Sequence, residues 1–308
     1  MKAVACSLLC LIGLLAAAET KSKPSMPERV KEFTDKYTTP ELVEKRHKEW
    51  IAAEPDDPDA YILPANGLLK IASTVTINSG TSNGGFATIV DPKTNKAVGT
   101  ISNEPDVKLQ QRAIGMLVAA TQKFPLRLDI HVGRMAVCQR ADDIAGLEQA
   151  AMSLLKSAGQ NGDRLLWSDD VPIAPPVQEK VISEIHPRIS WFYSKEKPET
   201  DEAASRVAVE ALKLYPKDVR LLNDAAIFHA YRSEWAQARE FFLQAAAVDP
   251  TDMLVQHNIA MATLRLGDKT GAIKRWQSIV DKVPGTDEAK SAQSEIDKLK
   301  GKPKPKKK

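Results

Sequence analysis

The sequence predicts a mainly α-helical protein built from repeated helix–turn–helix pairs. Pro216, Pro250 and Pro284 are spaced by 34 residues, a period typical of chains that stack one helical pair on the next. Apolar residues make up 43% of the 308 residues, and aromatic residues only 6%. Because most of the apolar side chains are small or aliphatic, this composition favours packed helices over a β-sandwich. The length allows one large or two modest domains.

The segments 217–250 and 251–284 match each other position by position. Small residues recur where paired helices must approach closely, and large rings recur where the space to the next pair must be filled. The coinciding positions are Ala226 with Ala260, Ala238 with Ala272, Phe242 with Trp276, and Ala245 with Ile279. Asp218 and Asp252 each follow a break at proline, so we expect their carboxylates to cap the next helix.

This pattern resembles the tetratricopeptide repeat (TPR), and the resemblance extends over about residues 185–300. It implies a TPR-like fold, a right-handed solenoid of helix–turn–helix repeats. A third copy covers residues 183–216, with Pro198 and Thr200 marking its turn. Two departures from the family pattern are visible. Ser233 stands where the following copy has a turn glycine, and the usual aromatic residues of the first helix are missing.

The chain divides into segments that differ in composition and pattern. They are a signal peptide at 1–18, an N-terminal helical segment at 19–58, a helix plus a β insertion at 59–105, degenerate TPR-like helices at 106–158, an irregular loop at 159–180, three TPR-like repeats at 181–284, a capping helix at 285–300 and a Lys-rich disordered tail at 301–308. The irregular loop is predicted from its proline and glycine content, and the capping helix from its polar composition.

The amino-terminal half is less regular than the repeats. A helix is expected near 40–54, ended by Pro55 and Pro58, and a degenerate repeat is expected to turn at 141–143. Residues 73–102 break the helical pattern because they are rich in Val, Ile, Thr and Gly. Three runs of β-branched residues, with a proline turn between the last two, predict a β-hairpin or a three-stranded insertion there.

The first residues have the composition of a secretory signal peptide. Lys2 gives a short positive end, residues 5–15 form an apolar run, and residues 16–18 supply small side chains for cleavage. The run is shorter than the roughly 20 residues of a membrane span. A membrane anchor and a lipoprotein at Cys10 are the alternatives. Because the mature chain can form no internal disulfide, we expect a periplasmic or secreted protein of a bacterial cell envelope, without a transmembrane segment.

Charge is distributed unevenly along the chain. The formal net charge is +3. The signal peptide holds one lysine, and the last eleven residues hold seven lysines and no acid, so the rest of the chain carries a net charge of −5. This mildly acidic body does not suggest a nucleic-acid groove. The tail at 301–308 is interpreted as a solvated end, and binding of an anionic envelope polymer through its lysines is the alternative.

No motif for catalysis, a cofactor or a metal is present in the sequence. HExxH, GxxxxGK, GxSxG and a glycine fingerprint after a strand are all missing. The five histidines are far apart in sequence: His47, His131, His186, His229 and His257. Cys138 is the cysteine that signal removal leaves, and its apolar-patterned surroundings predict a buried structural thiol. We therefore expect no metal, no cofactor and no enzymatic activity.

The loop sequence LWSDD provides an alternative functional hypothesis. It contains Trp167 beside the paired carboxylates of Asp169 and Asp170. Paired carboxylates can perform acid–base chemistry, although they cap helices or bind water more often. In this alternative the protein is an enzyme or an enzyme accessory subunit that uses this loop together with the 73–102 insertion.

The concave face implied by the TPR resemblance is the leading candidate site. The residues that the resemblance places on the groove side of the first helices are Arg220, Asn223, Ile227 and Tyr231 in one repeat and Leu254, His257, Asn258, Met261 and Arg265 in the next. Such repeats typically bind a protein or peptide there, with Asn and basic side chains contacting backbone and carboxylate groups. The predicted function is a non-catalytic scaffold, with a protein or peptide and no specific nucleic acid as its partner.

Overall fold

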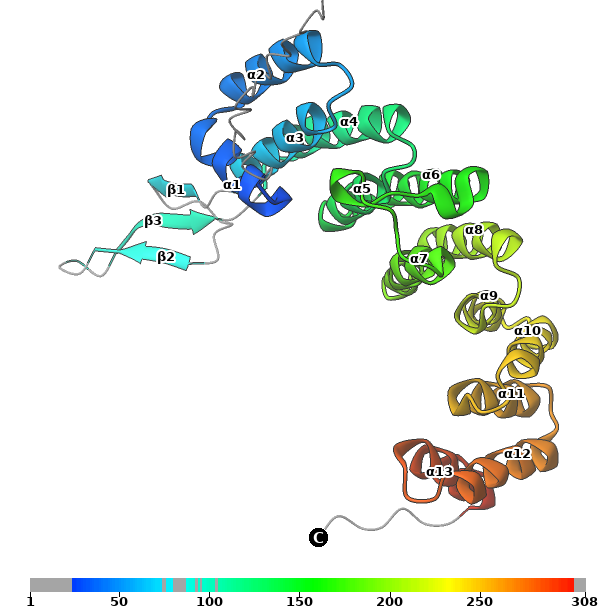
Figure 1. Ribbon diagram of the computed structural model, residues 1–308. Helices are drawn as coiled ribbons and strands as arrows, with labels where there is room; N and C mark the ends of the chain where they lie inside the picture. Colours follow the sequence, from blue (N-terminus) through cyan, green and yellow to red (C-terminus); the bar gives the residue numbers. More distant parts are fainter. Residues whose placement is uncertain are drawn as a thin grey trace, which may run out of the picture.

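The computed structural model describes residues 24–73, 76–79, 87–91, 94, 96–102 and 105–301. The signal peptide predicted at 1–18 and the tail beyond residue 301 lie outside this part of the chain. Thirteen α-helices occur within the described residues (Figure 1). They are α1 (Met26–Lys36), α2 (Pro40–Ala53), α3 (Asp59–Ala72), α4 (Val107–Lys123), α5 (Leu128–Arg140), α6 (Ile144–Asn161), α7 (Val177–Tyr193), α8 (Pro198–Leu214), α9 (Val219–Tyr231), α10 (Trp235–Val248), α11 (Met253–Arg265), α12 (Lys269–Lys282) and α13 (Asp287–Lys300).

The helical pairs from α3/α4 to α11/α12 follow one another along an arc, with α13 at its carboxyl-terminal end (Figure 1). The apolar core of the described residues runs along this arc as successive clusters. Neighbouring clusters share one helix each time, first α5, then α9, then α11. This is the packing of a solenoid, in which each repeat contacts only its neighbours. The predicted mainly α helix–turn–helix solenoid is confirmed.

The small and large residues of the predicted repeats lie where the packing between helices requires them. Ala226, Ala260, Ala238 and Ala272 are all fully buried, and so is the indole of Trp276. Because α9 to α12 approach one another at these alanines, a larger side chain there would force the helices apart.

The two predicted aspartate caps are also present. Asp218 accepts hydrogen bonds from the backbone N–H groups of Arg220 and Leu221 at the start of α9. Asp252 accepts one from Val255 at the start of α11, at 3.0 Å. Each cap satisfies backbone donors that have no partner within the helix, so the break at proline becomes a defined joint between pairs.

The third repeat differs from its prediction at both ends of its first helix. Helix α7 starts at Val177, within the stretch predicted to be irregular, and continues through Pro187 to Tyr193. It starts early because an apolar stripe from Val177 onward is buried at helical spacing. Pro198, predicted to mark the turn, is instead the first residue of α8, where its missing N–H costs no helical hydrogen bond.

The amino-terminal part contains short elements as well as helices. Helix α2 lies where a helix was expected near residue 40, whereas α1 was not foreseen as a separate helix. The strands β1 (Thr76–Ser79), β2 (Ala87–Val90) and β3 (Ala97–Ser102) pair antiparallel in the order β1-β3-β2. Within the described residues, no helix is both long enough and apolar enough to cross a membrane.

Candidate functional site

The candidate residues of α9 and α11 lie on corresponding sides of two neighbouring first helices. Asn223 lies three residues after Arg220, and Tyr231 lies eight residues after Asn223. This spacing places the three side chains on one side of a helix. The matching α11 residues follow the same spacing from Leu254 to Arg265. In Figure 1 the first helices α7 and α9 lie on the inner side of the arc, and the second helices α8 and α10 on the outer side. We call the side of α9 and α11 that carries the candidate residues the inner face.

Two asparagines couple the two helices at the centre of the inner face. The side-chain Nδ2 of Asn258 donates a hydrogen bond to Oδ1 of Asn223 at 3.0 Å, and both side chains are half-buried. An amide has two donor hydrogens and an acceptor oxygen. This bond therefore leaves the Asn223 amide N–H groups and the Asn258 oxygen for further hydrogen bonds, and no other described residue takes them.

Two large apolar side chains of the inner face are exposed to solvent. Tyr231 is 58% exposed and Leu254 is 60% exposed, although both belong to helices whose other apolar residues are largely covered. The ring of Tyr231 lies against the ring of Tyr193 on α7, with centroids 5.5 Å apart. Tyr231 therefore packs against α7 at Tyr193, which is itself buried.

The two arginines of the inner face are held differently. Arg220 donates to both carboxylate oxygens of Glu179 at 2.7 and 2.8 Å and to Asp218 at 2.8 Å. These carboxylates raise the pKa of the Arg220 guanidinium, so its charge is already neutralised within the protein. Arg265 is exposed, and its guanidinium lies over the ring of Trp235, 5.4 Å from the centroid. Arg265 is therefore the more accessible cation.

The other three predicted residues of the inner face belong largely to the protein interior. Ile227 and Met261 pack against the apolar clusters, and Nδ1 of His257 lies 3.2 Å from the indole N–H of Trp276, from which it accepts a hydrogen bond. Burial lowers the pKa of His257, so the neutral imidazole that accepts this bond is favoured. These residues form the base of the inner face.

A histidine–aspartate pair beside the inner face was not predicted. Nδ1 of His186 on α7 lies 2.8 Å from Oδ2 of Asp224 on α9, and Asp224 is only 2% exposed. The hydrogen bond to Asp224 raises the pKa of His186, whereas burial raises the pKa of Asp224. Tyr193 donates to the backbone carbonyl of Asp224 at 2.9 Å. Sequence spacing gave no signal for the pair because His186 and Asp224 are 38 residues apart, which differs from the repeat period of 34.

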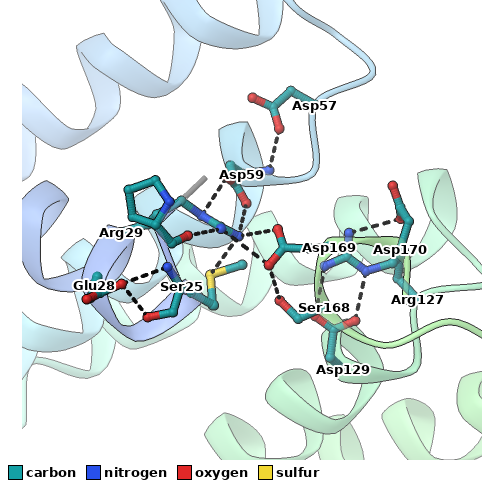
Figure 2. Close-up of polar contacts among 12 residues, drawn as sticks. Ser25, Glu28, Arg29, Asp57, Asp59, Arg127, Asp129, Ser168, Asp169 and Asp170 are labelled. Atoms are coloured by element: carbon teal, nitrogen blue, oxygen red, sulfur yellow. Dashed lines mark hydrogen bonds and ion pairs between the residues drawn. The ribbon is translucent and has the colours of Figure 1, made fainter. Parts of the chain in front are cut away.

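The carboxylates of the LWSDD loop point toward two different arginines rather than toward each other (Figure 2). Arg29 of α1 donates to Asp169 at 2.7 Å and also pairs with the buried Asp59 at 2.9 Å. Arg127 donates to Asp170 at 3.3 Å and binds Asp129 through two nitrogens at 2.9 Å. The two arginines are themselves buried. The loop therefore joins α1 and α3 to α5 through charge-assisted hydrogen bonds.

The backbone of this loop is also constrained. Asp169 and Asp170 have φ angles of 57° and 58°, in the left-handed region that side chains other than glycine rarely adopt. Such residues cost about 1–3 kcal/mol each and persist only where the surroundings hold them. The bonds from Arg29 and Arg127 supply that restraint. The two carboxylates therefore have a structural role, in which each bonds a different arginine.

Cys138 and the histidines do not converge. Cys138 is fully buried, as predicted. Burial raises the pKa of its thiol to about 11. Burial likewise lowers the pKa of His131 to about 4. Within the described residues, no three His, Cys, Asp or Glu side chains are placed to hold a metal ion.

Comparisons with known proteins give similarity at the level of structure only. No family model and no curated protein sequence match the chain. Among solved structures, the chain is similar to YrrB, a TPR protein with an unusual peptide-binding site, at 13% identity and a TM-score of 0.43, covering 80% of this chain and 97% of that one.

Two further solved structures show the same level of similarity. The type IV pilus biogenesis factor PilW matches at 9% identity and a TM-score of 0.41, over 88% of this chain and all of that one. A TPR protein from Parabacteroides merdae matches at 13% identity and a TM-score of 0.37, over 89% and 88%. Because these values are low, the TPR-type repeat rests on the spacing and packing within this chain.

Proposed function

We propose that the protein is a non-catalytic scaffold that binds an extended peptide segment of a partner protein on the inner face of α9 and α11. The observation that carries this proposal is the coupled pair Asn223–Asn258, flanked by the exposed side chains of Tyr231 and Leu254. An apolar surface next to unused amide groups is typical of a surface that binds another molecule.

The chemistry of the inner face suits a peptide backbone. An extended peptide presents N–H and C=O groups along its length. The free oxygen of Asn258 can accept from such an N–H, and the free amide hydrogens of Asn223 can donate to such a C=O. Tyr231 and Leu254 would contact apolar side chains of the ligand, and Arg265 would favour a nearby acidic residue.

The proposal can be tested with peptides selected from a random-sequence display library on the purified protein. We expect selected peptides to bind at least about tenfold more weakly when Asn223→Ala, Asn258→Ala and Arg265→Ala are combined. The matched control combines Gln237→Ala, Gln244→Ala and Lys274→Ala, three exposed residues of the second helices α10 and α12. Equal affinity of both triple variants, or no selectable peptide, would contradict the proposal.

The proposed location is the bacterial cell envelope, either periplasmic or secreted. It is supported by the signal-peptide pattern at 1–18, a part of the chain outside the described residues. The location has its own test. Fractionation of cells that express the full chain should place a shortened protein outside the cytoplasm, and recovery of the uncleaved chain in the cytoplasm would contradict it.

A further inference from the structure

A cavity of about 360 Å³ lies between the amino-terminal helices, distant in sequence from the inner face of α9 and α11. Its walls come from the first helices α3 and α5, Leu117 of α4 contributes to the lining, and Met26 and Pro27 of α1 close one side. Trp167 and Ser168 of the LWSDD loop complete it. Most lining side chains are apolar, so a bound group would lose contact with water on entering.

Three acidic residues either line this cavity or follow its lining residues in the chain. Asp129 lines the cavity, and Asp169 and Asp170 follow its lining residues directly in the loop. The carboxylate of Asp170 is 68% exposed, whereas the side chains of Arg29 and Arg127 are buried. Figure 2 shows the two arginines beside Asp169 and Asp170. The arginines therefore fix the carboxylates from inside, and a molecule at the rim meets acidic groups.

We propose that this cavity is a second binding site, which takes an apolar side chain of a peptide that has a lysine or arginine next to it. The apolar side chain would fill the cavity between α3 and α5, and the adjacent cation would lie near Asp170. The occupant is a segment of a partner protein with this basic–apolar sequence. The carboxylate rim disfavours an acidic peptide and a fatty-acid headgroup, because like charges repel there.

This proposal goes beyond the inner face of α9 and α11 and does not depend on it. The two sites share no residue, and their charges differ, since Arg265 is the accessible cation of one and Asp170 an accessible anion of the other. The triple variant at Asn223, Asn258 and Arg265 should leave binding to the cavity unchanged. Failure of one site is therefore distinguishable from failure of the other.

Two glycines supply a matched pair of variants. Gly133 on α5 lines the cavity, and a Cβ there would meet no atom of a neighbouring element within 4 Å. Gly133→Leu would extend into the cavity without a clash at its base. Gly115 on α4 has equally open surroundings but is exposed outside the cavity, so Gly115→Leu is the control.

A third variant tests the charge at the rim. Asp170→Asn removes one exposed carboxylate, and asparagine tolerates the left-handed backbone at that position. Arg127 keeps its two bonds to Asp129 in this variant, so the loop retains its support.

The test is calorimetric titration of the purified protein with three blocked pentapeptides. They carry leucine between two lysines, leucine between two glutamates, and glycine between two lysines. We expect the lysine–leucine peptide to bind at least about tenfold more tightly than the other two. We also expect Gly133→Leu to weaken it by about tenfold or more, Gly115→Leu to leave it within about twofold, and Asp170→Asn to weaken it with a smaller salt dependence.

Several results would overturn the proposal. They are no binding of the lysine–leucine peptide at millimolar concentration, equal binding of the glutamate–leucine peptide, and equal binding by the parent and Gly133→Leu. Circular dichroism shows whether Gly133→Leu folds. If it does not, an unchanged affinity in Asp170→Asn at low salt still overturns the proposed basic preference.

Discussion

The two ends of the arc consist of helical pairs of the same kind, but the first helices of these pairs have different surroundings. At the carboxyl-terminal end, α9 and α11 present Tyr231 and Leu254 to solvent. At the amino-terminal end, α1 and the loop of residues 165–171 lie against α3 and α5, bound there by Arg29 and Arg127 (Figure 2). A regular repeat therefore leaves the face of its first helices open, whereas extra segments at the amino-terminal end cover part of this face and leave a cavity beside α3 and α5.

The largest expected effect concerns the regular end. Ala260→Trp should lower the free energy of unfolding by more than about 3 kcal/mol, because Ala260 is fully buried against Trp276 and the helices would have to separate. Thermal unfolding followed by circular dichroism measures this. Ala247→Trp, at an exposed position of α10, is the control and should melt near the parent. If Ala260→Trp melts like the parent, the repeat register is wrong.

The next effect concerns the covered end. Arg29→Ala should cost about 3 kcal/mol, since it removes the buried guanidinium that pairs with both Asp59 and Asp169. The loss should be local, so hydrogen exchange should accelerate in α1 and in the LWSDD loop but not in α11 to α13.

The control for Arg29→Ala is a surface ion pair. Arg206 bonds Glu148 at 2.6 Å, and its side chain is half-exposed, so Arg206→Ala should cost less than about 1 kcal/mol. Equal losses in the two arginine variants would mean that the contacts of Arg29 do not hold α1 in place.

The boundary between the two ends gives a pH-dependent effect. The hydrogen bond to Asp224 raises the pKa of His186 above its usual 6.5. Stability from the protonated histidine is therefore complete below the unfolded value and is lost as pH rises through the raised value. His186→Ala should be most destabilising near about pH 6 and less destabilising toward about pH 9, where the neutral imidazole of the parent keeps only a hydrogen bond to Asp224. Urea unfolding across this range checks it, and a difference that grows with pH would contradict the assignment.

The smallest effect concerns the joint between repeats. Pro250 is exposed and lies between α10 and the capped start of α11, so Pro250→Ala should mainly increase the freedom of the unfolded chain. The expected loss is about 0.4–1 kcal/mol, measurable by urea titration. Asp252→Ala, which removes the cap, should cost at least as much. A much larger loss for Pro250→Ala would mean that proline positions the next pair rather than merely ending a helix.

The repeats could be predicted from the sequence because their determinants are local and periodic. Close helix packing requires alanine at fixed intervals, and the break and the aspartate cap recur with the same period. The candidate residues of the inner face were taken from the TPR resemblance, and they lie on the first helices α9 and α11. The sequence could not show which of these residues are already paired within the protein, as Arg220 is with Glu179 and Asp218.

The ion pairs of the amino-terminal end could not be predicted from the sequence, for a physical reason. Arg29 and Asp169 are 140 residues apart, and neither position has a repeat equivalent that would reveal the pairing. His186 and Asp224 are 38 residues apart, a separation that the 34-residue repeat period does not indicate. Long-range charge pairs depend on the folded geometry, whereas the periodic spacing of apolar residues in a helix can be read from the sequence.

Peptide binding on the inner face is most directly tested by thiol labelling of Leu254→Cys, with position 254 followed by peptide mass spectrometry. A peptide selected on the purified protein should slow labelling there by at least about tenfold at saturation. Val209→Cys, on the exposed surface of the outer helix α8, should react at an unchanged rate. If a saturating peptide leaves the labelling rate at position 254 unchanged, the ligand binds elsewhere and the proposed function of the inner face is contradicted.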